Sequence, residues 1–463
     1  LHASTDQLQW TVDAYQVTYA GLLLVAGALV DRWGKSRTFL VGAGVFGACS
    51  LLAGLTTATG PLIWTRALMG IGAALMAPAT LALVSALFRT PQERSLAFAI
   101  WSAANGAGGA AGPLLSGLLL ERFSWGAIFL INVPIAVLIV AIGLFVIPHS
   151  RPHRVPGGVD LPGALLSTAA LGLICWAVIS APGLGGASPL VLGASLAGLS
   201  LLAVFIYWES RATQPILRLS LFRNRRFSVA VGVSGLVTAG GAGALFVLTQ
   251  YLQYSLRFTP LQTGLRILPI AAAMLLGALS APRLIDHLRL KRTVLFGLGC
   301  VAAGFGWLAT ATTESTFGQV LPGALLFGLG AGLLVPAATQ AVMDSLPADA
   351  AGTGSATNTA LMQVGSALGV AVIGSLLAAR YRHIMMTSPL WPQLGQWQSA
   401  ALESVAGALR AARQLPAELA NQLSALAVHG FVAGMRLALL TSAASVLLAA
   451  GIVAISYPRD RRV

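Results

Sequence analysis

Long uninterrupted apolar stretches constrain this chain more than any other feature of its sequence. A helix of roughly 18 to 25 apolar residues crosses a bilayer, because it satisfies its backbone hydrogen bonds internally. The sequence predicts thirteen such helices. They lie near residues 11–30, 39–57, 62–86, 95–120, 124–147, 160–180, 189–208, 226–250, 262–284, 291–310, 318–342, 355–379 and 431–457. The predicted fold class is therefore an all-α membrane protein in contact with a lipid bilayer.

Composition excludes several other classes of protein. Residues are 56% hydrophobic and 9% charged, whereas soluble domains are about 25% charged. The net charge of +14 does not indicate a nucleic-acid partner, because the basic residues form short clusters between apolar stretches. Cys49, Cys175 and Cys300 lie in apolar stretches without metal-ligand spacing, so we expect no disulfide framework, metal or cofactor.

The distribution of Lys and Arg predicts the orientation, since short cytoplasmic loops retain positive charge. Alternate loops are unequal in this respect. One set, assigned to the cytoplasm, carries Arg32, Lys35, Arg37, Arg89, Arg94, Arg151, Arg154, Arg211, Arg218, Arg223, Arg225, Arg226, Arg283, Arg289, Lys291, Arg292, Arg459, Arg461 and Arg462. The opposite set holds scattered arginines such as Arg122, Arg257, Arg380 and Arg382. We therefore expect the first residues outside and the last residues inside.

An internal repeat recurs at an offset of roughly 255 residues. The segment L-V-D-R-W-G-K-S-R at 29–37 matches L-I-D-H-L-R-L-K-R at 284–292, and M-G-I-G-A-A-L-M-A-P at 69–78 matches F-G-L-G-A-G-L-L-V-P at 327–336. The helices that follow place Gly112 opposite Gly369. Two such halves predict two pseudo-symmetric six-helix bundles with a site between them near the midplane.

The repeat also predicts the domain organisation. We assign 1–148 to the first bundle, 159–209 to two inserted linker helices and 219–457 to the second bundle. Within the second bundle, 380–430 is an amphipathic outer loop, either purely structural or involved in substrate release. Two predicted helices precede the Asp286 loop, but only one precedes the Asp31 loop. We therefore expect the first bundle to lack its first helix in this chain.

The first motif is a charged loop, G-A-L-V-D-R-W-G-K-S-R at 27–37. Its glycines allow close helix approach and a tight turn, its aspartate can cap the next helix, and its cations can bridge to acidic partners. We predict that this loop holds the cytoplasmic side shut in one state; the alternative is a solvated basic loop. The predicted gating residues are Gly27, Asp31, Arg32, Gly34, Lys35 and Arg37.

The second motif, W-T-R-A-L-M-G-I-G-A-A at 64–74, sets Arg66 within a predicted helix. An arginine in a membrane costs about 2.5 to 3.5 kcal/mol on insertion scales unless it is paired or reaches water. We expect a functional role, with snorkelling to the outer interface as the alternative. Asp13 is the carboxylate of the first apolar stretch, and we predict that it titrates as a proton site or pairs with Arg66. Exposure to outer water is its alternative.

The third motif is G-A-G-G-A-A-G-P-L-L-S-G at 106–117. Pro113 removes a backbone donor and kinks the helix, while Gly108, Gly112 and Gly117 leave a smooth face for a partner helix. A plain packing face remains the alternative.

Together the three motifs resemble the major facilitator superfamily, and specifically its drug:proton antiporter family with fourteen transmembrane helices. The resemblance implies that Arg66 takes part in proton coupling and that 106–117 is an antiporter motif, with Ser116 where the family prefers glycine. It also implies fourteen helices, both termini in the cytoplasm and a further proton site on the expected first helix. The antiporter motif argues against an importer.

The sequence thus predicts a multidrug-type secondary active exporter in a bacterial cytoplasmic membrane, not an enzyme. No nucleotide-binding motif offers another energy source, so protons are the expected partner, and we expect a monomer. The alternatives are a major facilitator importer and a non-transporting lipid-binding or sensor protein. Polar and aromatic residues on apolar helices predict the cavity for a small-molecule substrate, or else interhelical hydrogen bonds. They are Tyr15, Tyr19, Trp101, Asn105, Gln250, Asn358 and Gln363.

Overall fold

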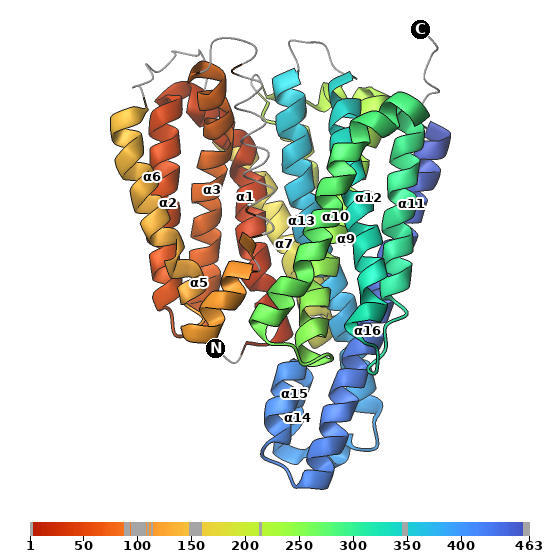
Figure 1. Cartoon of the computed structure of the whole chain (residues 1–463). Coiled ribbons are helices and arrows are strands. Elements are labelled where there is room, and N and C mark those ends of the chain that lie inside the picture. The colour runs from red at the N-terminus through yellow and green to blue at the C-terminus, as the bar shows by residue number, and fades with distance from the viewer. Residues whose placement is uncertain are drawn as a thin grey trace.

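The chain folds into a bundle of long helices. The structure is a computed structural model that describes residues 3–87, 93, 108, 111–112, 114–147, 160–212, 215–344 and 351–456. Within this part, all regular structure is helical, which confirms the predicted fold class. Helix α1 begins at the lower end of the bundle and α16 ends at the upper end (Figure 1). The distribution of arginine in the sequence predicts that the lower end lies outside.

Ten of the described helices are long and apolar enough to cross a membrane. Helices α1 and α11 pack in the same bundle but carry more polar residues, and most of the predicted span 95–120 lies outside the described residues. A count of fourteen is therefore not confirmed. The helices are α1 (Thr5–Trp33), α2 (Lys35–Leu55), α3 (Thr59–Leu87), α5 (Ala127–Leu130), α6 (Asn132–Val146), α7 (Leu161–Leu184), α8 (Pro189–Arg211), η1 (Leu219–Arg223), α9 (Arg225–Tyr254), α10 (Pro260–Leu288), α11 (Leu290–Leu308), α12 (Phe317–Asp344), α13 (Ala351–Thr387), η3 (Trp391–Trp397), α14 (Gln398–Glu403), α15 (Val405–Ala412) and α16 (Ala417–Ser456).

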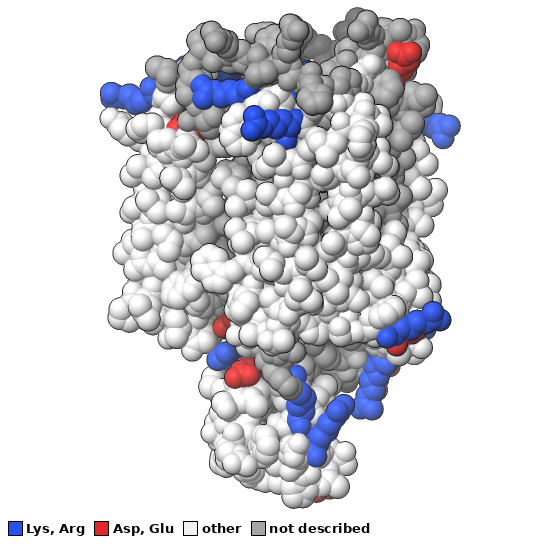
Figure 2. Space-filling model, turned by 90° about the vertical axis from the view of Figure 1, so that its left-hand side faces the viewer, with Lys and Arg blue, Asp and Glu red and all other residues white. Residues whose placement is uncertain are grey.

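The outer surface of the bundle is apolar between two charged ends. Figure 2 shows this belt on one face, with Lys and Arg gathered above and below it. Large apolar side chains point outwards within the belt, among them Phe145 and Leu448. Such a surface is stable against lipid but not against water. The chain is a multi-pass membrane protein.

The two matching charged loops have the same backbone. Gly34 joins α1 to α2 with φ of 88° and ψ of 145°, and Arg289 joins α10 to α11 with φ of 71° and ψ of 157°. Both residues end one helix and begin the next. The repeat seen in the sequence therefore specifies the same sharp turn twice, even though only one copy carries the glycine that this conformation favours.

Equivalent glycines also bring equivalent helices together. A Cβ atom added to Gly70 of α3 would lie 2.7 Å from the Tyr15 carbonyl oxygen of α1, and one added to Gly328 of α12 would lie 2.6 Å from a carbonyl oxygen of α10. Gly72 meets α2 and Gly330 meets α11 in the same way. The α1, α2 and α3 group is thus packed like the α10, α11 and α12 group.

The segment 380–430 differs from a loop lying flat on the bundle. Helix α13 continues to Thr387 and α16 begins at Ala417, so both extend well beyond the predicted spans 355–379 and 431–457. With η3, α14 and α15 they form a projection at the lower end (Figure 1). Leu394, Ala408 and Leu423 are buried inside it. Its apolar helix faces therefore pack against the extension of α16.

The turn between α1 and α2 should be sensitive to a side chain. We predict that Gly34→Ala lowers the thermal stability of the detergent-solubilised protein, because a Cβ at this positive φ costs about 1–3 kcal/mol. Gly27→Ala is the matched control, since no atom lies within 4 Å of a Cβ built there. The thermal stability of both variants is measured by heating the protein and then determining the folded fraction by size-exclusion chromatography. Equal losses of stability would contradict the prediction.

Candidate functional site

Arg66 lies between α3 and α1, close to the lower end of the bundle. Its Nε donates a hydrogen bond of 2.8 Å to the carbonyl oxygen of Thr11. The guanidinium carbon lies 4.5 Å from the ring centroid of Tyr15 and 6.0 Å from that of Phe129. In the described part of the chain these neighbours include no carboxylate. A part-buried cation is therefore held by a backbone oxygen and two aromatic faces, and no anion among the described residues cancels its charge.

A polar stripe on α1 faces the other way. Gln9, Asp13 and Gln16 are spaced so that they share one helical face, and Gln9 and Asp13 are fully buried. We call these three residues the α1 stripe. Gln9 Nε2 donates to the carbonyl oxygens of Val370 and Ala371 on α13, at 3.3 and 3.2 Å. Gln9 Oε1, Gln16 Oε1 and both carboxylate oxygens of Asp13 lack a hydrogen-bond partner among the described residues.

The structure does not bring Asp13 to Arg66. Thr11 and Tyr15, which hold Arg66, each lie two positions from Asp13 and thus on the opposite side of α1. The stripe shares its face with Val17, which packs with apolar residues of α7 and α13 in one buried cluster. Asp13 therefore lies at the junction of α1, α7 and α13 and is buried there, not exposed to outer water as the alternative supposed.

The gating residues have mixed environments. Gly34 forms the turn, and Gly27 is a helical residue with open space around it. Arg32 and Lys35 are half-buried and Arg37 is exposed. The side chain of Asp31 lies outside the described part, so its capping role stays a prediction.

In the described part of the predicted antiporter motif, Gly117 makes a close contact. Gly117 is buried, and a Cβ built on it would lie 2.6 Å from the Cα atom of Leu261 at the start of α10. Gly108 and Gly112 are exposed. Pro113 lies outside the described residues.

The structure joins two of the predicted cavity residues. The rings of Tyr15 and Tyr19 lie 5.8 Å apart, next to Arg66. Gln250 instead donates to the Phe246 carbonyl oxygen of its own helix at 3.2 Å. The remaining predictions are not joined to this pair by any described contact. Asn358 is buried with Oδ1 unpartnered, Gln363 is half-buried, and Trp101 and Asn105 lie outside the described residues.

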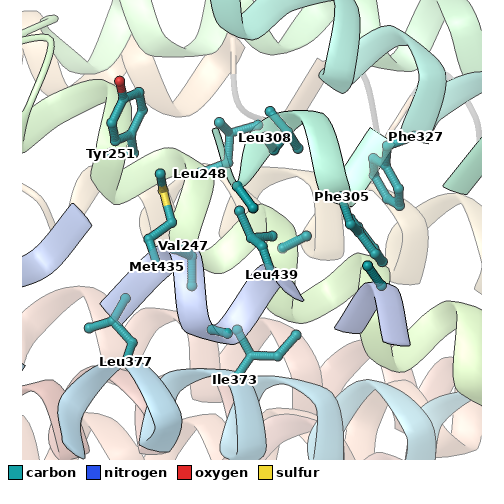
Figure 3. Close-up of a cluster of buried hydrophobic side chains, with 14 of the residues drawn as sticks. Val247, Leu248, Tyr251, Phe305, Leu308, Phe327, Ile373, Leu377, Met435 and Leu439 are labelled. Atoms are coloured by element: carbon teal, nitrogen blue, oxygen red, sulfur yellow. The ribbon is translucent and has the colours of Figure 1, made fainter. Parts of the chain in front are cut away.

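Two crevices lie in the apolar core of the second half of the chain and involve none of these residues. One crevice is lined by Leu248, Tyr251, Leu308, Met435 and Leu439 (Figure 3). The other lies among α9, α11, α12 and α16 and is likewise largely apolar. With few polar groups to orient a ligand, both are interpreted as packing gaps between helices.

The sequence analysis missed the role of Gln9, Gln16 and Gly374. Gln9 and Gln16 stand four residues before and three residues after Asp13, which is the spacing of a single helical face. That signal was available. The role of Gly374, in contrast, is recognisable only once α13 is placed against α1, because the side chain that contacts it belongs to Gln9, which is far away in the sequence.

The ring of Tyr15 should stabilise the Arg66 arrangement. We predict that Tyr15→Leu lowers thermal stability, because it removes a cation–π contact of about 0.5 to 2 kcal/mol. Tyr15→Phe should retain most of it, since the aromatic face remains. Thermal unfolding of both variants in detergent is the measurement. Equal stability of the Leu and Phe variants would show that the ring contributes no more than apolar bulk.

Comparison with known proteins shows which family and which relatives this chain resembles. Residues 1–370 match the family model described as Major Facilitator Superfamily. The chain is 33% identical over 459 residues to the "Tetracenomycin C resistance and export protein" of Streptomyces glaucescens, covering 98% of this chain and 85% of the relative. It is 32% identical over 458 residues to the "Multidrug efflux pump LfrA" of Mycolicibacterium smegmatis, covering 99% and 90%.

Solved structures share the fold. A bacterial homologue of the human lysosomal transporter Spinster, in an inward-facing and unoccupied conformation, superposes with a TM-score of 0.60 at 14% identity. The match covers 99% of this chain and 98% of that chain. At this identity, the likeness concerns the arrangement of the helices alone.

Proposed function

The chain belongs to the major facilitator superfamily, a family of transporters and not of enzymes, and we propose that it exports small apolar or amphipathic molecules in exchange for protons. The export direction is supported by relatives along nearly the whole chain that are described as export and efflux proteins. The predicted antiporter motif supports the same direction. Similarity to bacterial proteins and the distribution of arginines support a bacterial cytoplasmic membrane as its location.

Arg66 is the observation that carries the coupling part of the proposal. It is a cation in the outer part of a bundle whose surface is apolar, and it is held by an α1 carbonyl and by Tyr15. A fixed charge that no described carboxylate neutralises attracts an anionic or acidic group during the cycle and repels protons when that group is absent. A purely structural role would be served as well by an apolar residue of the same volume.

The transport cycle in this proposal is alternating access. The bundle of residues 1–148 and the bundle of residues 219–457 act as the two bodies that rock about a central site, and 159–209 supplies two accessory helices. One chain contains both bodies, so a monomer suffices. The repeated glycine contacts of α3 and α12 support two bodies of equivalent internal packing.

Replacing Arg66 tests the proposal directly. We predict that Arg66→Ala abolishes proton-driven uptake of amphipathic fluorescent dyes into inverted membrane vesicles while the amount of folded protein stays nearly unchanged. Arg66→Lys should retain partial activity, because lysine keeps the charge but not the forked donor geometry. The control is Arg223→Ala, an exposed arginine of η1 that lies outside the predicted gating residues. Full transport by Arg66→Ala would refute the coupling role.

The same vesicles separate the competing functions. A drug-susceptibility panel, with and without expression of the full-length gene, first identifies an exported compound. Uptake that needs an acidic vesicle lumen, with protons flowing out as the compound enters, and that collapses with a protonophore supports the exporter. Movement in the opposite direction supports an importer, and no gradient-dependent movement of any compound supports a lipid-binding or sensor protein.

Asp13 is proposed as a proton-exchange site. Its carboxylate is buried without a hydrogen-bond partner in the described residues, so a change in its proton occupancy changes the charge of the α1, α7 and α13 junction. We predict that Asp13→Asn alters the dependence of export on pH, with a flattened profile as the expected result. Export rates measured across a pH series provide the test. An unchanged rate and profile would show that Asp13 is structural.

A further inference from the structure

At the lower end, a buried side chain of the first half forms hydrogen bonds with a helix of the second half. Gln9 of α1 donates its amide hydrogens to the carbonyl oxygens of Val370 and Ala371 on α13. These oxygens belong to a continuous helix, so they accept the amide in addition to their helical bonds. The contact joins the start of α1 to the outer part of α13, across the boundary between the first and second halves.

Gly374 is what allows this contact. It lies one turn beyond Val370 on the same face of α13, and a Cβ atom built on it would overlap the amide of Gln9. The neighbouring Ser375 donates its hydroxyl to the Val178 carbonyl oxygen of α7 at 2.7 Å. The surface of α13 is therefore shaped to receive Gln9 at one position and α7 at the next.

A second contact at the same end has the same construction. Gly117 lies five residues after Gly112, and Gly374 lies five residues after Gly369, so the repeat makes Gly117 and Gly374 equivalent. Gly117 meets the start of α10 at Leu261, just as Gly374 meets the start of α1 at Gln9. The two halves therefore meet twice at the outer end. In each case a glycine of one half packs against the first turns of a helix in the other half.

A carboxyl group lies near the junction. Asp6 precedes the predicted span 11–30 of α1. Burial raises the pKa of its carboxyl group, and the Arg382 guanidinium of α13 lowers that pKa by a smaller amount.

We infer that Gln9, seated against Gly374, is the latch that holds the outer side of the transporter closed. This rests on the proposed transport by two moving bodies. Release of the Gln9 amide from Val370 and Ala371 is the step that separates α1 from α13 and opens the path outwards. A buried amide suits this role, because its two hydrogen bonds are lost together and are replaced by water when the junction opens.

Cys175 provides a native reporter for the latch. It is fully buried on α7 in the cluster of α1, α7 and α13 residues, one turn deeper than Val178. Replacing Cys49 and Cys300, which are also buried, leaves it as the single cysteine of the chain. A membrane-impermeant thiol reagent added to intact cells, with no substrate, then reports opening of the outer side.

The decisive variant is Gly374→Ala in this background. We expect the labelling rate of Cys175 to rise about tenfold, because the added methyl displaces the amide and removes both hydrogen bonds. Gly172→Ala is the matched control at the same junction, since a Cβ there meets only Val17 Cγ1 at 3.8 Å. Gln9→Ala should raise labelling as well. Adding Gly374→Ala to Gln9→Ala should raise it no further, since the displaced group is already gone.

Equal labelling of Gly374→Ala and Gly172→Ala, in protein that remains monodisperse, would overturn the latch. If the Gly374→Ala variant does not fold, an unchanged labelling rate of Cys175 in the Gln9→Ala variant would also overturn the latch. Additive effects of the two changes would also overturn it, because they would act at separate places. The labelling assay requires no added substrate and measures no transport, so a failed latch leaves the proposed export untouched, and a failed export assay leaves the labelling result valid.

Discussion

Close approach of helix backbones through glycine is the constraint on which this structure depends. In lipid, burial of apolar side chains gives helices little reason to associate, so van der Waals contact and interhelical hydrogen bonds must hold them together. Glycines supply that contact here: a Cβ on Gly243 of α9 would lie 2.8 Å from the Gly369 carbonyl oxygen of α13. Gly365 and Gly369 meet α9 even more closely. Because no side chain separates these backbones, each contact fixes the depth and rotation of both helices.

That register decides where the polar groups lie. Helix α1 is bound on one side to α3 and on the other to α7 and α13, so its two faces have different chemistry. One face holds Arg66 by a carbonyl oxygen and a tyrosine ring, and the opposite face carries the α1 stripe. A cation and a carboxyl group are thus kept apart by the thickness of one helix. Motion of α1 against α13 would act on the carboxyl group without disturbing the arginine contact.

Much of the fold was predictable because lipid imposes simple rules. Apolar runs identified the helices, and the matched segments at 29–37 and 284–292 predicted a turn that Gly34 and Arg289 both form. The outer ends of α13 and α16 extend beyond the predicted spans, because they form part of the projection and pack there against η3, α14 and α15 and not against lipid. Of the site, Arg66 was predicted as a coupling residue and Tyr15 separately as a cavity residue, and only the structure places the two together. The stripe was recognised only at Asp13, because amides such as Gln9 and Gln16 carry no charge to attract notice.

The sequence by itself determined the membrane class, the positions of most helices, the internal repeat and the family, since each depends on local composition or on short motifs. Only the tertiary structure decided which polar groups meet. Asp13 and Arg66 are close enough in apparent depth to pair, but the rotation of α1 places them on opposite faces. Gln9 and Gly374 are separated by most of the chain and are joined because α1 and α13 cross there. Such pairings depend on helix rotation and interhelical distance, which are properties of the packed bundle and of no single segment.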